Sequence, residues 1–268
     1  MTTLNVPMLA PVAATMRRRI LVNFRGDPRR VARILAHPFR PKLVHGASLV
    51  GICLIRLEHL RPAWMPEPFG VASENAAHRI AVEWSESGST REGVFVARRH
   101  TNSSLNKWVG GHLFPGVHHR GQFDCHETKG VIRVRFVATE GDTEVEVVAR
   151  PSESMPPGSV FPTLEEASRF FSNGCDGWSV ARDGTGLEGA RLDADVWELK
   201  PLRIDKARSS LLDTWFHTPD GGLEFDSAFV MRDVPHRWHS LGPASGPGSV
   251  ATTPRCRPHR RAALFELP

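Results

Sequence analysis

Hydrophobic and polar residues alternate along much of the chain, and this period-two pattern predicts more strands than helices. The clearest case is residues 131–137 and 143–149, which alternate around Glu140-Gly141-Asp142 and predict a β-hairpin. Residues 19–24 predict a first strand, and residues 47–57 are almost continuously apolar, as in a strand buried on both faces. The pattern therefore indicates a largely antiparallel sheet.

Other stretches extend this sheet. Residues 78–84 and 93–98 predict a strand pair joined by a polar loop at residues 85–92. Later in the chain the same pattern predicts three more strands, at residues 178–182, 196–202 and 228–232.

Two helices interrupt the strands. Asp27 followed by Pro28 is a typical helix start, and it predicts a short helix that reaches Leu35. Thr163 and Glu166 form a capping box ahead of an apolar face, and Gly174 marks the end of that helix. Strands with a few helices indicate an α+β protein.

The composition indicates one domain with two dissimilar ends. We expect residues 17–241 to form a single domain, within which residues 151–162 are a proline-rich linker. Residues 1–16 are expected to be a flexible N-terminus. Residues 242–268 are basic and rich in Gly, Ser and Pro, which predicts a disordered tail.

The basic balance of the chain comes from these ends. The formal net charge is +5, and clusters at residues 17–19 and 255–261 account for all of it. The rest of the domain is therefore close to neutral, which argues against a nucleic-acid-binding protein.

The cysteines and the apolar runs indicate a soluble cytoplasmic protein. Four cysteines, at wide and unequal spacings without a CxxC pair, predict free thiols. No apolar run has the length of a membrane span, and the N-terminal charges follow the apolar residues, the wrong order for a secretory signal. We expect no membrane partner, and these features are compatible with a homo-oligomer.

Residues 110–120 hold the densest group of candidate chemical residues. His112, His118, His119 and Arg120 surround a turn at Pro115-Gly116. Histidine titrates near neutral pH, so one of these rings is a candidate general acid or base, and Arg120 is a candidate to hold an oxyanion. Because side chains alternate along a strand, only one of His118 and His119 can face a given pocket. An exposed turn with solvated histidines is the alternative interpretation.

A second group of candidates lies on the preceding strands. Glu74 is a candidate acid or base with Arg79 as its charge partner, although Arg79 in an ordinary ion pair is the simpler interpretation. Arg98 and His100 share one face of their strand and could point inward toward a substrate. We therefore predict Glu74, His118, His119 and Arg120 as catalytic, with Arg79, Arg98, His100, His112 and Phe114 as substrate-binding.

A metal centre is the competing use of these histidines. His112, His118, His119 and His126 supply suitable ligand types, but none of their spacings matches a known ligand motif such as HExxH. We predict neither a metal nor a cofactor.

Several blocks, taken in order, resemble a known family. They are residues 23–28, 46–55, 61–62, 74–79, 161–167, 174–179 and 197–202. In this order, over residues 17–238, the chain resembles the uncharacterised YqjF-like family, which is similar in fold to acetoacetate decarboxylase. The resemblance implies an acetoacetate decarboxylase-like α+β fold, with a curved, mostly antiparallel sheet or β-barrel around a central pocket and helices packed outside.

The chain departs from the enzyme family at its catalytic residue. Acetoacetate decarboxylases carry a Schiff-base lysine just after a proline, and the equivalent segment at residues 114–119 contains no lysine. Lys107 is the nearest, and beside Trp108 it is more simply a solvated surface amine.

Two function classes follow. The first is an enzyme that acts on a small organic carbonyl or carboxylate compound, of lyase, dehydratase, isomerase or cyclase type, through His and Glu acid-base chemistry and Arg electrostatics. The second is a non-catalytic protein that binds a small molecule in the same pocket. Burial of the candidate residues together in a cavity would favour the first.

Overall fold

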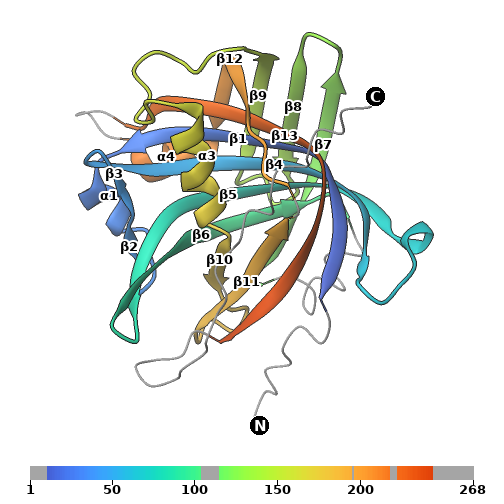
Figure 1. Cartoon of the computed structure of the whole chain (residues 1–268), viewed down its shortest axis with the longest axis horizontal. Helices are drawn as coiled ribbons and strands as arrows, with labels where there is room; N and C mark the ends of the chain where they lie inside the picture. Colours follow the sequence, from blue (N-terminus) through green and yellow to red (C-terminus); the bar gives the residue numbers. More distant parts are fainter. Residues whose placement is uncertain (1–10, 104–114, 195, 218–221, 244–268) are drawn as a thin grey trace, which may run out of the picture.

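The computed structural model of the chain describes residues 11–103, 115–194, 196–217 and 222–243. Within these ranges a single 13-stranded sheet dominates, with short helices packed against it (Figure 1). The strands are β1 (Val12–Gly26), β2 (Arg40–Pro41), β3 (Leu43–Val44), β4 (Ala47–Pro62), β5 (Val71–Glu86), β6 (Ser89–Thr101), β7 (His118–Glu127), β8 (Ile132–Ala138), β9 (Glu144–Pro151), β10 (Asp176–Val180), β11 (Leu187–Ala194), β12 (Lys200–Ser209) and β13 (Glu224–Pro243). The helices are α1 (Pro28–Ala32), η1 (Glu67–Phe69), α3 (Leu164–Asn173) and α4 (Ser210–Phe216).

The sheet curves until its pairing returns on itself. Its order is β11-β10-β6-β7-β8-β9-β12-β13-β1-β4-β5-β2, and β6 also pairs with β5 while β11 also pairs with β13. Most neighbours are antiparallel, and the two parallel pairs, β6 with β7 and β6 with β10, both involve β6. The central strands β13, β1, β4, β5 and β6 therefore have one face toward β7–β9 and the other toward β10 and β11.

Each face of these central strands buries its own apolar core. Ile20, Ile52 and Ile80 belong to a core that continues into β8, β9 and α4. Leu21 and Cys53, each one residue along its strand from a member of that first core, belong to a second core that packs against α3. Because successive side chains point to opposite faces, a strand between two cores must be apolar throughout, which explains the continuous apolar run of β4.

The local signals predicted both helix starts and the hairpin correctly. The Asp27 carboxylate accepts a hydrogen bond from the amide of Arg29 at the start of α1. The Thr163 hydroxyl accepts one from the amide of Glu166 at the start of α3, and Gly174 caps the other end. Strands β8 and β9 pair in the predicted hairpin.

Other boundaries differ from the predictions. Strand β1 begins at Val12, so residues 12–16 belong to the sheet and not to a flexible N-terminus, and β13 continues through residues 242 and 243. The predicted loop at residues 85–92 is a two-residue turn, Ser87-Gly88, with φ of 48° and 77°. Paired long strands buried on one face extend further than local polarity indicates, since their backbone groups find partners in the sheet.

Two further differences concern elements that local polarity obscures. The strand expected at residues 196–202 begins only at Lys200 and runs to Ser209. Strand β11 and helix α4 were not predicted. Glycines that precede β11 indicate a turn, and α4 follows strand β12 directly, without a loop to mark its start. None of the helices in the described part of the chain is both long and apolar enough to cross a membrane.

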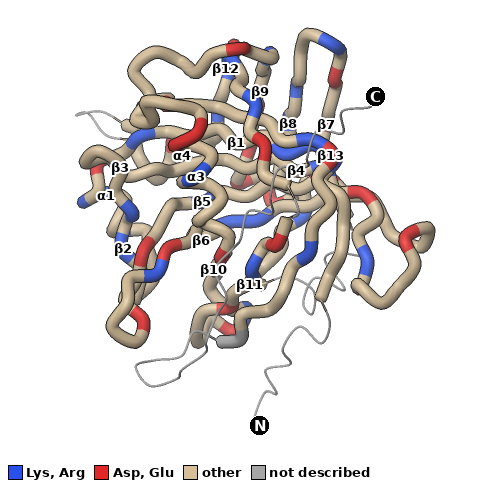
Figure 2. The backbone as a smooth tube through the Cα atoms, in the orientation of Figure 1, with Lys and Arg blue, Asp and Glu red and all other residues tan. Residues whose placement is uncertain are grey.

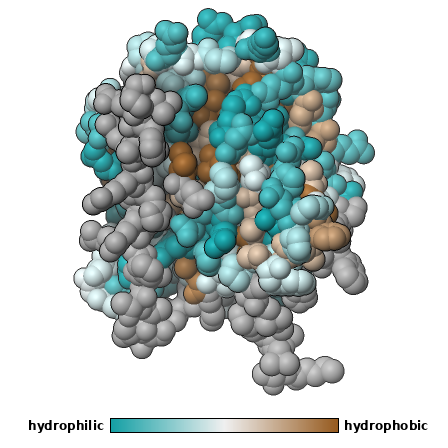
Figure 3. Space-filling view, turned by 45° about the vertical axis from the view of Figure 1, so that its right-hand side comes forward, coloured by the Kyte–Doolittle hydropathy of each residue, from teal (hydrophilic) through white to brown (hydrophobic). Residues whose placement is uncertain are grey.

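The surface is mixed in character. Figure 3 shows a face on which hydrophilic residues dominate, with apolar ones visible between them. Basic positions occur along central strands as well as at the periphery of the sheet (Figure 2), and β1 alone carries Arg17, Arg18 and Arg19. The charges on the central strands are the ones that matter for the candidate site.

Candidate active site

A cavity of about 130 Å³ lies on the α3 face of the central strands. It is smaller than the roughly 300–1,000 Å³ of pockets that take drug-sized ligands, so it suits a small organic molecule. Small residues make the space, among them Ala77 on β5, Gly177 on β10 and Ala190 on β11. The wall residues whose side chains could bind or react with a ligand include Arg19, Cys53, Asn75, Arg79, Arg99, Cys175 and His118.

Strand register brings four of the lining residues into one row. Cys53 of β4 pairs with Ala77 of β5, Ala77 pairs with Arg99 of β6, and Arg99 pairs with His118 of β7. Directly paired residues point to the same face of a sheet, and adjacent strands lie about 4.8 Å apart. The methyl group of Ala77 thus leaves open space between a thiol and a guanidinium.

Three arginines line this cavity, and each is held by uncharged groups. Arg79 donates to Oδ1 of Asn23 at 2.6 Å and lies 5.1 Å from the ring of Phe171. Arg99 donates to the hydroxyl of Ser179 at 3.2 Å. Arg19 lies 5.3 Å from the ring of Trp197. Neutral partners fix the side chains without cancelling their charge.

No described carboxylate compensates these three cations. No Asp or Glu is among the described residues that line the cavity, and none of the three arginines forms an ion pair with a described acidic side chain. Burial lowers the pKa of Arg79 and of Arg99 to about 10, so both stay protonated at neutral pH. A buried, unpaired charge is costly, and a bound anion would relieve that cost.

His118 lies beside these cations as a neutral ring. Burial, followed by the positive charges of Arg99 and Arg182, lowers its pKa to about 3. The ring is uncharged at neutral pH, so one of its nitrogens can donate a hydrogen bond and the other can accept one without adding a fourth positive charge. A bound anion would raise this pKa, since an opposite charge favours the protonated form.

His119 points to the opposite face, as strand alternation requires. Its Nδ1 lies 2.9 Å from a carboxylate oxygen of Glu140, which also pairs with Arg98 at 3.0 Å. The His119 ring lies 5.7 Å from that of His100, which in turn lies 6.2 Å from that of His78. The structure therefore places Arg98, His100 and His119 together, although His100 also contributes to the cavity wall.

The inner end of this histidine row is buried and uncharged. Nε2 of His78 lies 2.8 Å from the hydroxyl of Ser209. Burial, together with neighbouring positive charge, lowers the pKa of His78 to about 3 and that of His100 to about 4. Both rings are neutral at neutral pH.

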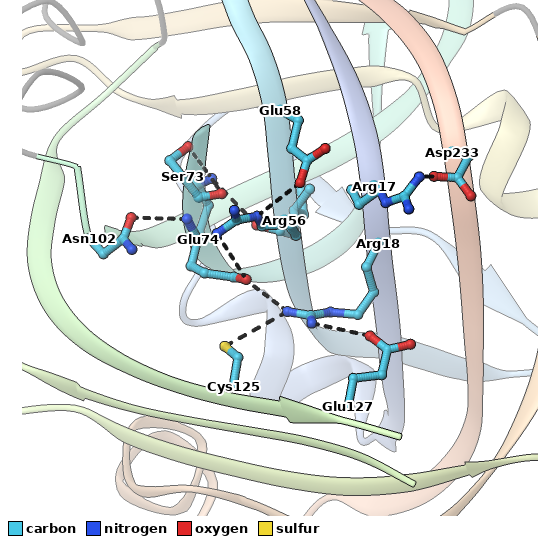
Figure 4. A network of polar contacts seen from close by, with 12 residues as sticks. Arg17, Arg18, Arg56, Glu58, Ser73, Glu74, Asn102, Cys125, Glu127 and Asp233 are labelled. Atoms are coloured by element: carbon cyan, nitrogen blue, oxygen red, sulfur yellow. Dashed lines mark hydrogen bonds and ion pairs between the residues drawn. The ribbon is translucent and has the colours of Figure 1, made fainter. Parts of the chain in front are cut away.

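The predicted pairing of Glu74 with Arg79 is wrong. Residues five apart on one strand point to opposite faces, and Glu74 instead accepts from Arg18 at 2.9 Å and lies 3.7 Å from Arg56 (Figure 4). Its main-chain amide donates to Asn102 at 2.9 Å. Burial raises the pKa of Glu74, and the two guanidinium groups act in the opposite direction.

The remaining predicted residues are not brought to the cavity in the described part of the chain. Arg120 shares the strand face of His118, but it is not among the described residues that line the cavity. His112 and Phe114 lie outside the described residues, as does Lys107. Within the described ranges, no three His, Cys, Asp or Glu side chains are placed so as to hold a metal ion.

Comparisons with solved structures decide the fold. The chain superimposes on acetoacetate decarboxylase from Legionella pneumophila with a TM-score of 0.57 at 12% identity, covering 91% of this chain and 92% of that one. An acetoacetate decarboxylase-like enzyme from Sphingomonas wittichii gives a TM-score of 0.52 at 14% identity, covering 87% of this chain and 92% of that one. The chain has an acetoacetate decarboxylase-like fold.

A third structure with this fold carries a ligand. The enduracididine biosynthesis enzyme MppR, in complex with pyruvate, matches with a TM-score of 0.53 at 12% identity, covering 90% of this chain and 91% of that one. No family model matches the chain, and no curated protein matches it significantly. At these identities the comparisons establish the acetoacetate decarboxylase-like fold alone.

Within this fold, the sequence patterns did not indicate five of the polar cavity residues: Arg19, Cys53, Asn75, Arg99 and Cys175. Arg99 stands in Arg98-Arg99-His100, a sequence typical of an exposed strand end. Only the parallel pairing of β6 with β7 shows that Arg99, and not Arg98, accompanies His118. The position of Arg19, a charged residue directly before an apolar run in the first strand, was a weak indication that its side chain lies in a site.

Proposed function

We propose that this protein is an enzyme that acts on a small organic carbonyl or carboxylate compound without forming a Schiff base on lysine. The observation that carries the proposal is the set of three guanidinium groups around one small cavity, that of buried Arg79 and those of partly buried Arg19 and Arg99, with no described counter-charge. Arginine binds carboxylates through paired hydrogen bonds, so a carboxylate ligand would satisfy donors that the protein leaves unsatisfied. No lysine is among the described residues of the cavity wall.

Each lining residue has a role in this proposal. Arg79 and Arg99 hold the carboxylate, and His118 moves a proton at the carbon next to the carbonyl. A guanidinium beside that carbonyl stabilises the enolate oxygen as negative charge develops on it. Anion binding raises the pKa of His118 toward the range in which imidazole exchanges protons at neutral pH.

The comparisons support this proposal at the level of chemistry. The neighbours of similar fold include acetoacetate decarboxylases and an enzyme solved with pyruvate, and both names point to small oxo carboxylates. We also propose the finer placement in the YqjF-like family, and a cytoplasmic location, in keeping with the free cysteines at positions 53, 125 and 175.

The other predicted residues have a structural role in this proposal. Glu74, Arg98 and His119 are each satisfied by an oppositely charged or hydrogen-bonding partner on the far face of the sheet. They stabilise the strands that carry the cavity residues.

The binding experiment compares adjacent arginines on opposite faces. Pyruvate binding, followed by calorimetry, is expected to weaken at least tenfold in Arg99→Gln, because a charge-assisted hydrogen bond contributes about 1.5–3 kcal/mol. Arg98→Gln is the matched control and is expected to change affinity less than about threefold, since its charge is paired elsewhere. Equal effects of the two substitutions would contradict the assignment of the cavity.

A second candidate function is ligand binding without turnover. The low pKa of His118, about 3 in the free protein, favours it, because such a ring is a weak base. Exchange of the pyruvate methyl protons in heavy water, followed by NMR, separates the two functions. Exchange that is lost in His118→Gln supports the enzyme; tight binding with no exchange supports the binding protein.

A further inference from the structure

Cys53 occupies a distinctive position in the cavity. It lies in the cross-strand row with Ala77, Arg99 and His118, and its side chain belongs to the α3 face of β4. The residue is 3% exposed and unpaired with any other cysteine. It is therefore a free thiol at the wall of a small cavity that apolar and charged side chains line together.

The cations of the cavity surround this thiol. Nε of Arg19 donates to Sγ of Cys53 at 3.4 Å. A negative charge on the Cys53 sulfur, as in the thiolate, would raise the pKa of Arg79 and of Arg99 against the larger effect of burial. All three guanidinium groups thus lie within electrostatic reach of one sulfur atom.

A second observation points to a ligand at this place. Arg79 is 5% exposed, and its Nε has no hydrogen-bond partner among the described residues, although the side chain lines the cavity. Nη1 of Arg19 is buried without such a partner as well. Unsatisfied donors next to a thiol would hold an anion against it.

The other described cysteines lack this setting. Cys125 lies 3.8 Å from Arg18, but burial and the charge of Glu74 raise its pKa to about 11. Cys175 also lines the cavity, and its thiol donates to the carbonyl of Ser172 at 2.7 Å. These two residues serve as internal controls.

We propose that Cys53 is the covalent nucleophile of this cavity and adds to the carbonyl carbon of a bound small oxo carboxylate. The inference rests on the proposed function, since the arginines must first hold the carboxylate. The sulfur–carbon bond forms as the π bond of the carbonyl breaks, and the thiol proton ends on the carbonyl oxygen. With a ketone such as pyruvate the product is a thiohemiketal, and no oxidant, reductant or co-reactant is needed. A thiol would thus do the work that an amine does in Schiff-base enzymes.

Alkylation kinetics test whether an anionic electrophile is directed to Cys53. Iodoacetate and iodoacetamide react with the same thiolate, so the ratio of their rates cancels the ionised fraction of the thiol. Each ratio of iodoacetate rate to iodoacetamide rate is divided by the ratio for the same cysteine in the unfolded chain. We expect this normalised ratio to be at least about tenfold higher at Cys53 than at Cys125, because charged clefts raise the local concentration of an opposite ion by about tenfold or more. Peptide mapping follows each cysteine separately in the unmodified protein.

Two variants make the alkylation test specific. Arg99→Gln is expected to lower the ratio at Cys53 several-fold, and Arg98→Gln is expected to leave it unchanged. An unreactive Cys53, or a ratio equal to that of Cys125, overturns the proposal.

Labelled pyruvate tests the covalent step and separates the two proposals. With carbon-13 at the carbonyl, the bound ligand is expected to show a tetrahedral carbon resonance in the wild type and in Cys175→Ala, but not in Cys53→Ala. Pyruvate that binds both Cys53→Ala and the wild type as the free ketone overturns the nucleophile and leaves the proposed function standing. Failure of the wild type to bind pyruvate, together with an unselective alkylation ratio, overturns both.

Discussion

The two faces of β5, β6 and β7 carry the same types of residue but differ in how the charges are paired. One face neutralises them with acidic side chains, and the other does not. On the face toward β8 and β9, Arg98 pairs with Glu140 and Asp142, and His119 pairs with Glu140. On the face toward α3, the next residue along β6, Arg99, donates to the hydroxyl of Ser179 and forms no ion pair with a described acidic side chain. Adjacent residues in the sequence thus divide into a compensated set and an uncompensated set.

In a sheet with two covered faces, this difference separates charges that stabilise the fold from charges that are available to a ligand. Compensated charges stabilise the native state or cost it little, whereas uncompensated buried charges lower its stability unless something binds them. The Glu74–Arg18 pair and the Arg79 side chain are similarly buried, and only the second lacks an acidic partner. The cavity face is therefore the functional candidate.

Removal of a charge from the compensated face should change stability the most. Glu74→Gln leaves Arg18 with only Glu127, 3.5 Å away, as its acidic partner, so we expect the free energy of unfolding to fall by about 3 kcal/mol. Glu144→Gln is the control, because its partner Arg135 is about half exposed and water screens the pair, so a much smaller loss is expected there. Urea denaturation measures both. Equal losses would mean that burial does not distinguish these pairs.

The histidine row predicts how stability depends on pH. The folded pKa values of His78 and His100, about 3 and about 4, lie below the ordinary value of 6.5, so protonation favours the unfolded chain. Stability is complete above pH 6.5 and falls as the pH falls, by about 2–3 kcal/mol per histidine at pH 4.5. In His100→Phe, the slope of unfolding free energy against pH in this window should drop by roughly one proton. An unchanged slope would show that His100 does not titrate with unfolding.

An internal counter-charge should compete with the ligand. Asn23→Asp places a carboxylate where Arg79 now donates to an amide oxygen at 2.6 Å, so we expect pyruvate affinity to fall about tenfold, or about 1.4 kcal/mol. Asn23→Ser removes the same acceptor without adding charge and should weaken binding less. Calorimetry compares the two variants; tighter binding in Asn23→Asp would contradict the role given to Arg79.

The last prediction concerns small changes in stability, which should have opposite signs in Arg99→Gln and Arg98→Gln. Arg99→Gln removes a partly buried cation with no described acidic partner and should raise the stability of the ligand-free protein by about 1 kcal/mol, as often happens when a functional site is neutralised. Arg98→Gln breaks ion pairs at a partly exposed site and should lower it by up to about 1 kcal/mol. Thermal unfolding without ligand measures both. A loss of stability in both variants would place Arg99 among the structural residues.

The sequence predicted more of the fold than of the site. Capping residues such as Asp27 and Thr163 act over three or four positions, so the helix starts could be found locally, and so could the β8–β9 hairpin. The start of β1 and the course of β12 depend on partners far along the chain, and their local patterns were misleading. Among the predicted site residues, only Arg79, His100 and His118 line the cavity in the described part of the chain.

The alternation of side chains follows from the sequence alone: His118 and His119 must face opposite ways, and so must Arg98 and Arg99, because neighbouring side chains in a strand point to opposite faces. Which member of each pair faces the cavity was decided by tertiary structure alone. The parallel pairing of β6 with β7 and the antiparallel pairing of β5 with β4 bring Cys53, Arg99 and His118 into one row, although 65 positions separate the first from the last. Strand register is a long-range property, set by two buried cores at once, and a local pattern cannot encode it.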